Sequence, residues 1–168
     1  MKRPNILLIT TDQQRYDTIC AMGYDFMETP NLDLLAAEGC CYPNAFSSNP
    51  VCMAARHQII TGLTARYHGF DDNYFESDPK MIPYDLPTLP QLLSDAGYDT
   101  IAIGKMHFQP CRRHNGFTKM ELMEEIPRYL EDDEYTKYLK ENGYGHLQSP
   151  HGVRHLLYML PQRSLIPE

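Results

Sequence analysis

The sequence lacks the features that mark several large classes of proteins. It has no Lys/Arg run longer than two residues, and its formal net charge is −7. Nucleic-acid-binding surfaces are usually basic, so this charge balance argues against a nucleic-acid partner. The longest apolar run near the N-terminus, Ile6–Ile9, is too short for a signal peptide or a transmembrane helix. The sequence therefore predicts a cytoplasmic protein with no membrane partner.

Cysteine is present in a pattern that fits neither a disulfide framework nor a zinc site. The five cysteines are odd in number, irregularly spaced and without a Cys-x-x-Cys pair: Cys20, Cys40, Cys41, Cys52 and Cys111. Reduced thiols are therefore expected. The chain has 168 residues, of which 42% are hydrophobic and 22% charged. This length and composition are typical of one globular domain.

Short apolar runs alternate with helical segments along most of the chain. The predicted elements are strands at 4–12, 41–46 and 98–105 and helices at 29–39, 52–61, 87–97 and 131–143. Leucines at 32, 34 and 35 are expected to face the core. This order of elements predicts an α/β fold with a mainly parallel sheet. Ligands in such folds bind beyond the carboxyl ends of the strands.

One cysteine occupies a position suited to chemistry. Cys52 begins the predicted helix 52–61, and Arg56 lies one turn further along the same face. The positive end of the helix dipole and the guanidinium would favour an anion or a nucleophile there. A small buried thiol is the alternative interpretation, since free cysteines are usually buried. Position alone leaves both interpretations open.

Two polar pairs end the predicted strands. Asp12 and Gln13 offer a carboxylate and an amide oxygen to a hard cation such as calcium or magnesium, or cap a turn instead. Lys105 and His107 lie on one side if the chain is extended, which would place a cation and a titratable imidazole in one space. Each of these alone is more often a surface lysine or a core histidine. Together the residues describe an anion site with acid–base capacity.

Four segments, in this order, resemble the N-terminal part of the type I sulfatases, in the alkaline-phosphatase-like superfamily. They are NILLITTDQQRYD, TPNLDLLAAEG, NPVCMAARHQIITGLTARYHG and LPTLPQLLSDAGYDTIAIGKMHF. The resemblance covers residues 1–117 well and 118–168 weakly. It implies that residues 1–168 are the N-terminal portion of one catalytic domain, truncated at its C-terminus. The implied fold is an incomplete α/β sheet with helices on both faces, and the implied function is sulfuric ester hydrolysis.

The resemblance also assigns roles to individual residues. Cys52-Met53-Ala54-Ala55-Arg56 matches the family signature, in which the cysteine is oxidised to Cα-formylglycine and its hydrate attacks the ester. The family cation is Ca²⁺, with Mg²⁺ or Mn²⁺ as alternatives. The implied roles are nucleophile precursor and metal ligand for Cys52, metal ligands for Asp12 and Gln13, catalytic groups for Arg56, Lys105 and His107, and a substrate contact for Asn73.

Two departures from the family pattern bear on partners. Gln13 stands where an aspartate is commonest, which should weaken cation binding without abolishing it. Ala54 stands where proline is commonest, and this variant resembles those matured by anaerobic radical-type formylglycine-generating enzymes. The expected partners are such a maturase and a sulfate-ester small molecule or glycan.

Two other functions stay open. A phosphonate monoester or phosphodiester hydrolase of the same superfamily also carries an Asp-Gln pair like that at residues 12–13. A non-catalytic truncated remnant is the second alternative, because further metal ligands expected from the family's second half are not identifiable. The surface loop predicted at 71–87 should carry specificity, but no code for a substrate can be read in it.

Overall fold

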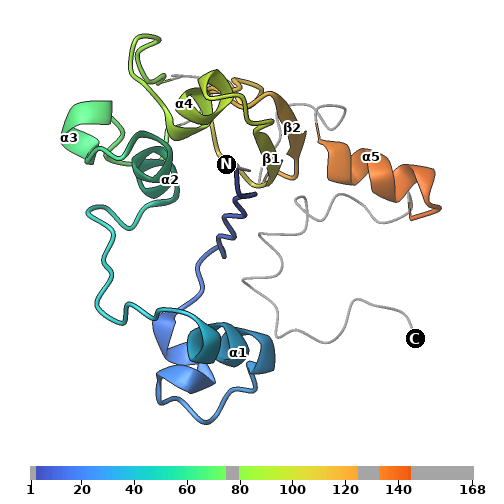
Figure 1. Ribbon diagram of the computed structural model, residues 1–168. Helices are drawn as coiled ribbons and strands as arrows, with labels where there is room; N and C mark the ends of the chain where they lie inside the picture. Colours follow the sequence, from blue (N-terminus) through green and yellow to red (C-terminus); the bar gives the residue numbers. More distant parts are fainter. Residues whose placement is uncertain (1–2, 75–79, 125–132, 145–168) are drawn as a thin grey trace. The chain divides into compact units, whose positions relative to one another are not determined.

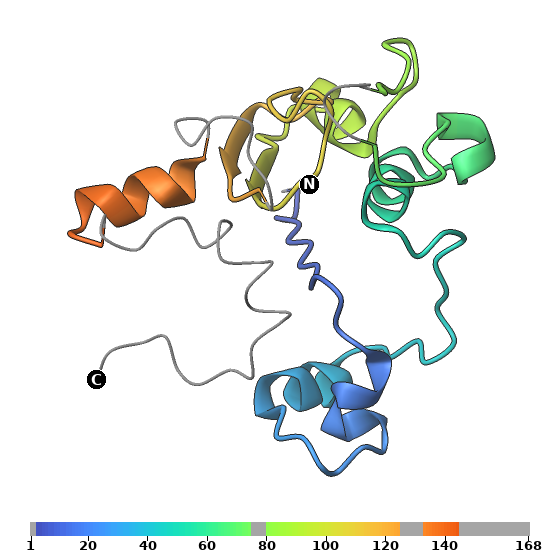
Figure 2. The same ribbon diagram turned by 180° about the vertical axis from the view of Figure 1, so that it is seen from behind.

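The structure, a computed structural model, describes residues 3–74, 80–124 and 133–144 (Figure 1; Figure 2 shows the reverse side). The chain forms two compact units, Met1–Phe46 and Ser47–Glu168. Each unit is described by itself below.

The first unit is built from short helices. It contains two 3-10 turns, η1 (Tyr16–Thr18) and η2 (Cys20–Met22), followed by α1 (Pro30–Glu38). Among its described residues none is buried. Leu34 and Leu35 are 55% and 65% exposed, so the prediction that the leucines of this helix face a core is wrong. The helix itself forms over Pro30–Glu38, but the described residues of this unit contain no buried apolar cluster for its leucines to join.

The predicted strands at 4–12 and 41–46 do not form. The described residues of both segments lie outside strands, and Ile6–Ile9 have exposed fractions between 63% and 84%. A strand requires hydrogen bonds to a neighbouring strand, which an apolar composition does not supply by itself. The apolar run was therefore a correct indication of β propensity but not of a formed strand.

The second unit contains the sheet and the remaining helices. Its elements are α2 (Cys52–Thr61), α3 (Ala65–His68), α4 (Leu89–Asp95), β1 (Ile101–Gly104), β2 (Lys119–Leu122) and α5 (Glu134–Glu141). Helix α2 has the predicted bounds and ends at Gly62, whose φ of 68° suits glycine. Thr88 caps the N-terminus of helix α4, and its side chain accepts the N–H of Gln91.

The two described strands are parallel neighbours, as Figure 1 shows. Ile101 pairs with Lys119 and Gly104 with Leu122. One face of the pair is buried through Ala102, Met120 and Leu122. Strand β2 was not predicted, although its sequence KMEL alternates polar and apolar residues, because four residues are the shortest run in which alternation indicates a strand. The parallel pair and its helices confirm the predicted α/β class.

The core of this unit joins α2 to the segment after β1. It contains Met53, Ala54, Ile60, Phe70, Ile82, Ala102, Phe108, Met120 and Leu122. His57 belongs to it as well: its ring stacks on that of Phe70, with centroids 3.8 Å apart and an interplanar angle of 7°. The core therefore fixes α2, whose first residue is Cys52, against the chain that follows β1. None of the described helices is long and apolar enough to cross a membrane.

Candidate active site at the start of helix α2

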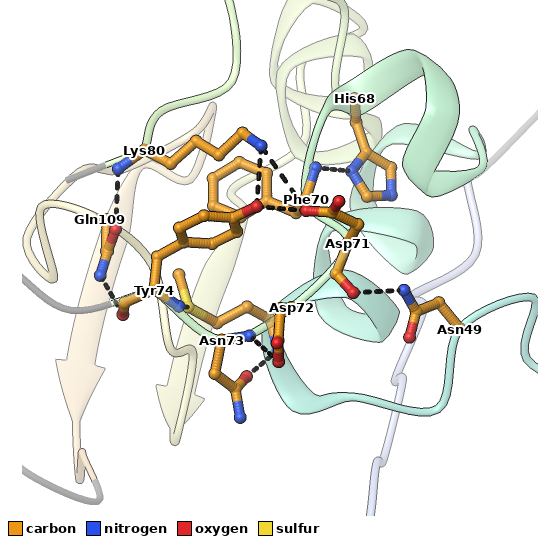
Figure 3. Close-up of polar contacts among 10 residues, drawn as sticks. Asn49, His68, Phe70, Asp71, Asp72, Asn73, Tyr74, Lys80 and Gln109 are labelled. Atoms are coloured by element: carbon orange, nitrogen blue, oxygen red, sulfur yellow. Dashed lines mark hydrogen bonds and ion pairs between the residues drawn. The ribbon is translucent and has the colours of Figure 1, made fainter. Parts of the chain in front are cut away.

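Cys52 is the first residue of α2, and a distant loop caps this helix. The N-cap residue, Val51, has no side chain able to accept a hydrogen bond. Instead the Asn73 side-chain oxygen accepts the N–H of Met53 at 3.0 Å. The first amide groups of a helix lack partners within the helix and need such an acceptor. The loop around Asn73 (Figure 3) therefore positions the end of the helix that carries Cys52.

Lys105 and Arg56 meet Cys52 at this end. The Lys105 Nζ lies 3.8 Å from the Cys52 Sγ, although the two residues are far apart in the sequence. The Arg56 Nη1 donates a hydrogen bond to the carbonyl oxygen of Lys105. The structure thus brings together three of the predicted site residues. The Lys105 ammonium and the positive end of the helix lie at the Cys52 thiol, and the Arg56 guanidinium binds the backbone of that lysine.

The segment after β1 turns instead of continuing as a strand. Gly104 and His107 have φ values of 94° and 56°. The argument that an extended chain places Lys105 and His107 on one side is therefore wrong, since strand alternation ends at Gly104. A positive φ at a residue other than glycine is uncommon and is maintained by its surroundings. At His107 those surroundings include a buried carboxylate.

That carboxylate belongs to Glu124, which the sequence analysis missed. Glu124 is 5% exposed, and its side chain accepts the N–H groups of Met106 and His107, each at 2.9 Å. Burial raises the pKa of Glu124, while these two hydrogen bonds and the nearby charges of Arg56 and Lys105 oppose that rise. No local sequence signal marks it, because its partners lie on the turn after another strand.

The loop that holds Asn73 is itself held by a polar cluster, drawn in Figure 3. The Tyr74 hydroxyl donates to Asp71, and Lys80 Nζ lies 3.0 Å from that hydroxyl and 4.4 Å from the ring centroid. These contacts lower the pKa of Asp71. The buried Gln109 amide accepts the N–H of Lys80 at 2.9 Å and donates to the carbonyl oxygen of Tyr74. The loop is thereby joined to the segment that follows Lys105.

The predicted metal ligands belong to different units. Asp12 and Gln13 lie in the first unit and are exposed, whereas Cys52 lies in the second. Residues 3–74, 80–124 and 133–144 contain no group of three or more His, Cys, Asp or Glu side chains arranged for a metal. Asp12 and Gln13 offer hard oxygens, the donors that calcium prefers, but two residues fall short of its usual six to eight ligands. The cation site stays a prediction.

Comparison with known proteins places this geometry in a family. The sulfatase family model matches residues 4–158. An arylsulfatase of Clostridium perfringens is 41% identical over 120 residues, which cover 71% of this chain and 24% of that protein. An N-acetylglucosamine-6-O-sulfatase of Bacteroides thetaiotaomicron is 32% identical over 148 residues, which cover 85% of this chain and 25% of that protein. The chain thus spans about a quarter of the length of these relatives.

The fold has a solved counterpart. The crystal structure of a phosphonate monoester hydrolase of Agrobacterium radiobacter matches 88% of this chain and 30% of its own, with a TM-score of 0.70 and 26% identity. This likeness confirms the predicted alkaline-phosphatase-like fold. The matched family model includes Cys52, Arg56 and Lys105, the residues that the structure brings together. The chain belongs to the sulfatase family.

Proposed function

We propose that the full-length protein is a sulfuric ester hydrolase whose nucleophile is formed at Cys52. The observation that carries this proposal is the Lys105 ammonium, 3.8 Å from the Cys52 Sγ at the start of a ten-residue helix. Family membership makes sulfate esters the first substrate class to test, as small molecules or as glycans, because the relatives named above include an arylsulfatase and a sugar sulfatase.

The residues at this site are suited to an anionic group. The Lys105 ammonium and the N-terminal end of α2 would stabilise negative charge that develops on the sulfuryl oxygens. Arg56 adds a second positive charge and, through its bond to the Lys105 carbonyl, holds the backbone from which that ammonium extends. Asn73 holds the helix start and lies in the loop in which we expect substrate contacts. His107 would act as the general base or acid.

The proposed nucleophile requires maturation of Cys52. A formylglycine at this position would supply a hydrated aldehyde, which offers two hydroxyl groups where the thiol offers none. We propose an anaerobic-type maturase as the partner because Ala54 replaces the commonest proline. We propose Ca²⁺ as the cation, with Mg²⁺ or Mn²⁺ as alternatives, and Asp12 and Gln13 would offer it hard oxygen ligands.

The test is co-expression of the full-length protein with an anaerobic-type maturase. Mass spectrometry of the peptide that contains residue 52 should show an aldehyde, and the protein should hydrolyse 4-nitrophenyl sulfate. Cys52→Ala should abolish turnover, whereas Cys20→Ala, at another half-buried cysteine, should not. Chelation should stop turnover and added Ca²⁺ should restore it. A plain thiol at residue 52, or equal turnover by Cys52→Ala, would contradict the proposal.

A second candidate function is favoured by the structural comparison. Because the solved counterpart is a phosphonate monoester hydrolase, the same site could act on phosphonate monoesters or phosphodiesters. Both substrate classes present an anionic centre to the same ammonium and guanidinium groups. The ratio of kcat/KM for phenyl phosphonate esters to that for 4-nitrophenyl sulfate decides between them. A matured protein that hydrolyses neither ester and binds no Ca²⁺ would instead support the non-catalytic alternative.

A further inference from the structure

The turn that follows Lys105 is held by one buried side chain. The Glu124 carboxylate accepts the Met106 N–H at 2.9 Å and the His107 N–H at 2.9 and 3.0 Å through its two oxygens. Consecutive backbone N–H groups that bind a single carboxylate fix the peptide planes between them. The backbone of both residues after Lys105 is therefore fixed by Glu124.

Glu124 is itself held by a second buried acid. Its N–H donates to the Asp133 Oδ2 at 3.0 Å, and the Asp133 Oδ1 accepts the N–H of Thr136 at 2.7 Å at the start of α5. Asp133 is 0% exposed. The parallel pairing continues past β2, since the Met123 N–H donates to the Gly104 carbonyl at 3.2 Å. These bonds place Glu124 beside the turn and leave its carboxylate directed at it.

Lys105 is consequently fixed on three sides. Arg56 binds its carbonyl oxygen, Glu124 binds the N–H of the next residue, and its own ammonium lies against the Cys52 Sγ. Movement of the turn would change the direction in which the lysine side chain leaves the backbone. The left-handed φ of 56° at His107 would also relax, because the hydrogen bonds that maintain this unfavourable conformation would be lost.

We propose that Glu124 is a positioning residue of the hydrolase site, whose carboxylate sets the turn at 106–107 and thereby places the Lys105 ammonium beside residue 52. This inference rests on the proposed function for its effect on catalysis. Its geometric part, the placement of Lys105, holds for the unmodified thiol and can be tested without turnover.

The first experiment measures the position of Lys105 through the Cys52 thiol. The full-length protein is made without a maturase and alkylated with iodoacetate, an anion, or with iodoacetamide, which is neutral, and residue 52 is followed by mass spectrometry. The nearby ammonium should favour the anionic reagent. Lys105→Met should lower the ratio of the two rates about fivefold, which corresponds to about 1 kcal/mol for unit charges about 4 Å apart in water.

Glu124→Asp is the main variant, because it keeps the charge and withdraws the carboxylate by one methylene. It should lower the same ratio toward the Lys105→Met value. The matched control is Glu121→Asp, at a 45% exposed side chain on β2, and it should leave the ratio unchanged. Glu124→Gln keeps the length and removes the charge; a raised ratio in this variant would mean that Glu124 acts through its charge alone and would overturn the proposal.

The second experiment measures catalysis in the matured protein. Glu124→Asp should lower kcat for 4-nitrophenyl sulfate about 100-fold, the usual effect of displacing a catalytic group by about 1 Å, with KM changed less than about threefold. If the matured wild type shows no turnover but the alkylation ratio still depends on Glu124, the proposed function is rejected and the role of Glu124 in placing Lys105 is retained. The positioning role is overturned if Glu124→Asp and Glu124→Gln both keep the wild-type alkylation ratio and kcat. It is also overturned if neither variant folds.

Discussion

The stability of this protein should depend on pH through one buried histidine. His57 is 1% exposed, its ring stacks on Phe70, and its Nδ1 lies 2.7 Å from the carbonyl oxygen of Met53. Burial lowers the pKa of His57 from 6.5 to about 4, and the hydrogen bond to Met53 opposes only part of that shift. Protonation would place a charge within the aromatic core, where desolvation is costly.

The sign of the effect follows from the lowered pKa. Between about pH 6.5 and about pH 4 the unfolded chain binds a proton at His57 and the folded chain does not, so the stabilising contribution is complete above pH 6.5 and is lost as the pH falls. The difference between the two pKa values corresponds to about 3 kcal/mol. Burial lowers the pKa of His68 and raises that of Glu124, and these groups act in opposite directions over the acidic range.

The variant His57→Phe isolates this contribution, because it keeps an aromatic ring against Phe70 and removes the titrating group. Urea unfolding can be followed by tyrosine fluorescence, since the chain has 12 tyrosines and no tryptophan. The free energy of unfolding of the wild type relative to that of His57→Phe should fall by about 3 kcal/mol between about pH 7 and about pH 4. Contributions from His68 and Glu124 cancel in this comparison.

If the wild type and His57→Phe stay parallel over the whole range, burial does not keep His57 neutral, and the reasoning is refuted.

Two further predictions concern close packing and capping around α4. Gly116→Ala should destabilise the protein by about 3 kcal/mol or more, because its φ is 94° and a Cβ would clash with the backbone nitrogen of Gln91. The control, Gly23→Ala, has the same φ but nothing within 4 Å of the new Cβ, and it should cost about 1 kcal/mol. Equal urea midpoints for the two variants would contradict this prediction. Thr88→Val should cost about 1–2 kcal/mol in the same assay, because the hydroxyl accepts the Gln91 N–H at 3.3 Å and also donates to a backbone carbonyl. Thr64→Val, at a helix start without a side-chain cap, should change the midpoint little.

Sequence patterns predicted helix α2 and strand β1, whose residues lie within one short segment of the chain. Helix α2 has its predicted bounds because the helical pattern is closed by Gly62, which adopts the left-handed conformation common at helix ends. The strand predicted over 98–105 forms as β1, from Ile101 to Gly104. Strand β2 was not predicted because a strand is defined by its partner: it pairs with β1, and Met120 and Leu122 are buried in a core that includes residues of distant segments.

At the candidate site, the residue types could be predicted from the sequence but their contacts could not. Cys52 and Lys105 could be selected from the sequence because they lie at a helix start and just after a strand end, and Arg56 because it lies one turn along the helix from Cys52. The geometry that joins Lys105 to Cys52 could not, because it depends on a turn with a left-handed residue at His107 rather than on strand alternation. The burial of Glu124 could not be predicted, because a glutamate is expected at the surface unless its hydrogen-bond partners are known.

Asn73, which caps α2, has one role that was predicted from the sequence and one that was not. Asn73 was expected to contact substrate, yet its side-chain oxygen serves the amide of Met53, the residue after the candidate nucleophile. Under the proposed function, substrate contacts made by this loop would be coupled to the position of residue 52, because any displacement of Asn73 leaves a helix amide without its acceptor. Gln109 extends this coupling, since it joins the same loop to the segment after Lys105. The start of α2 and the segment after Lys105 are therefore both tied by hydrogen bonds to the loop that contains Asn73.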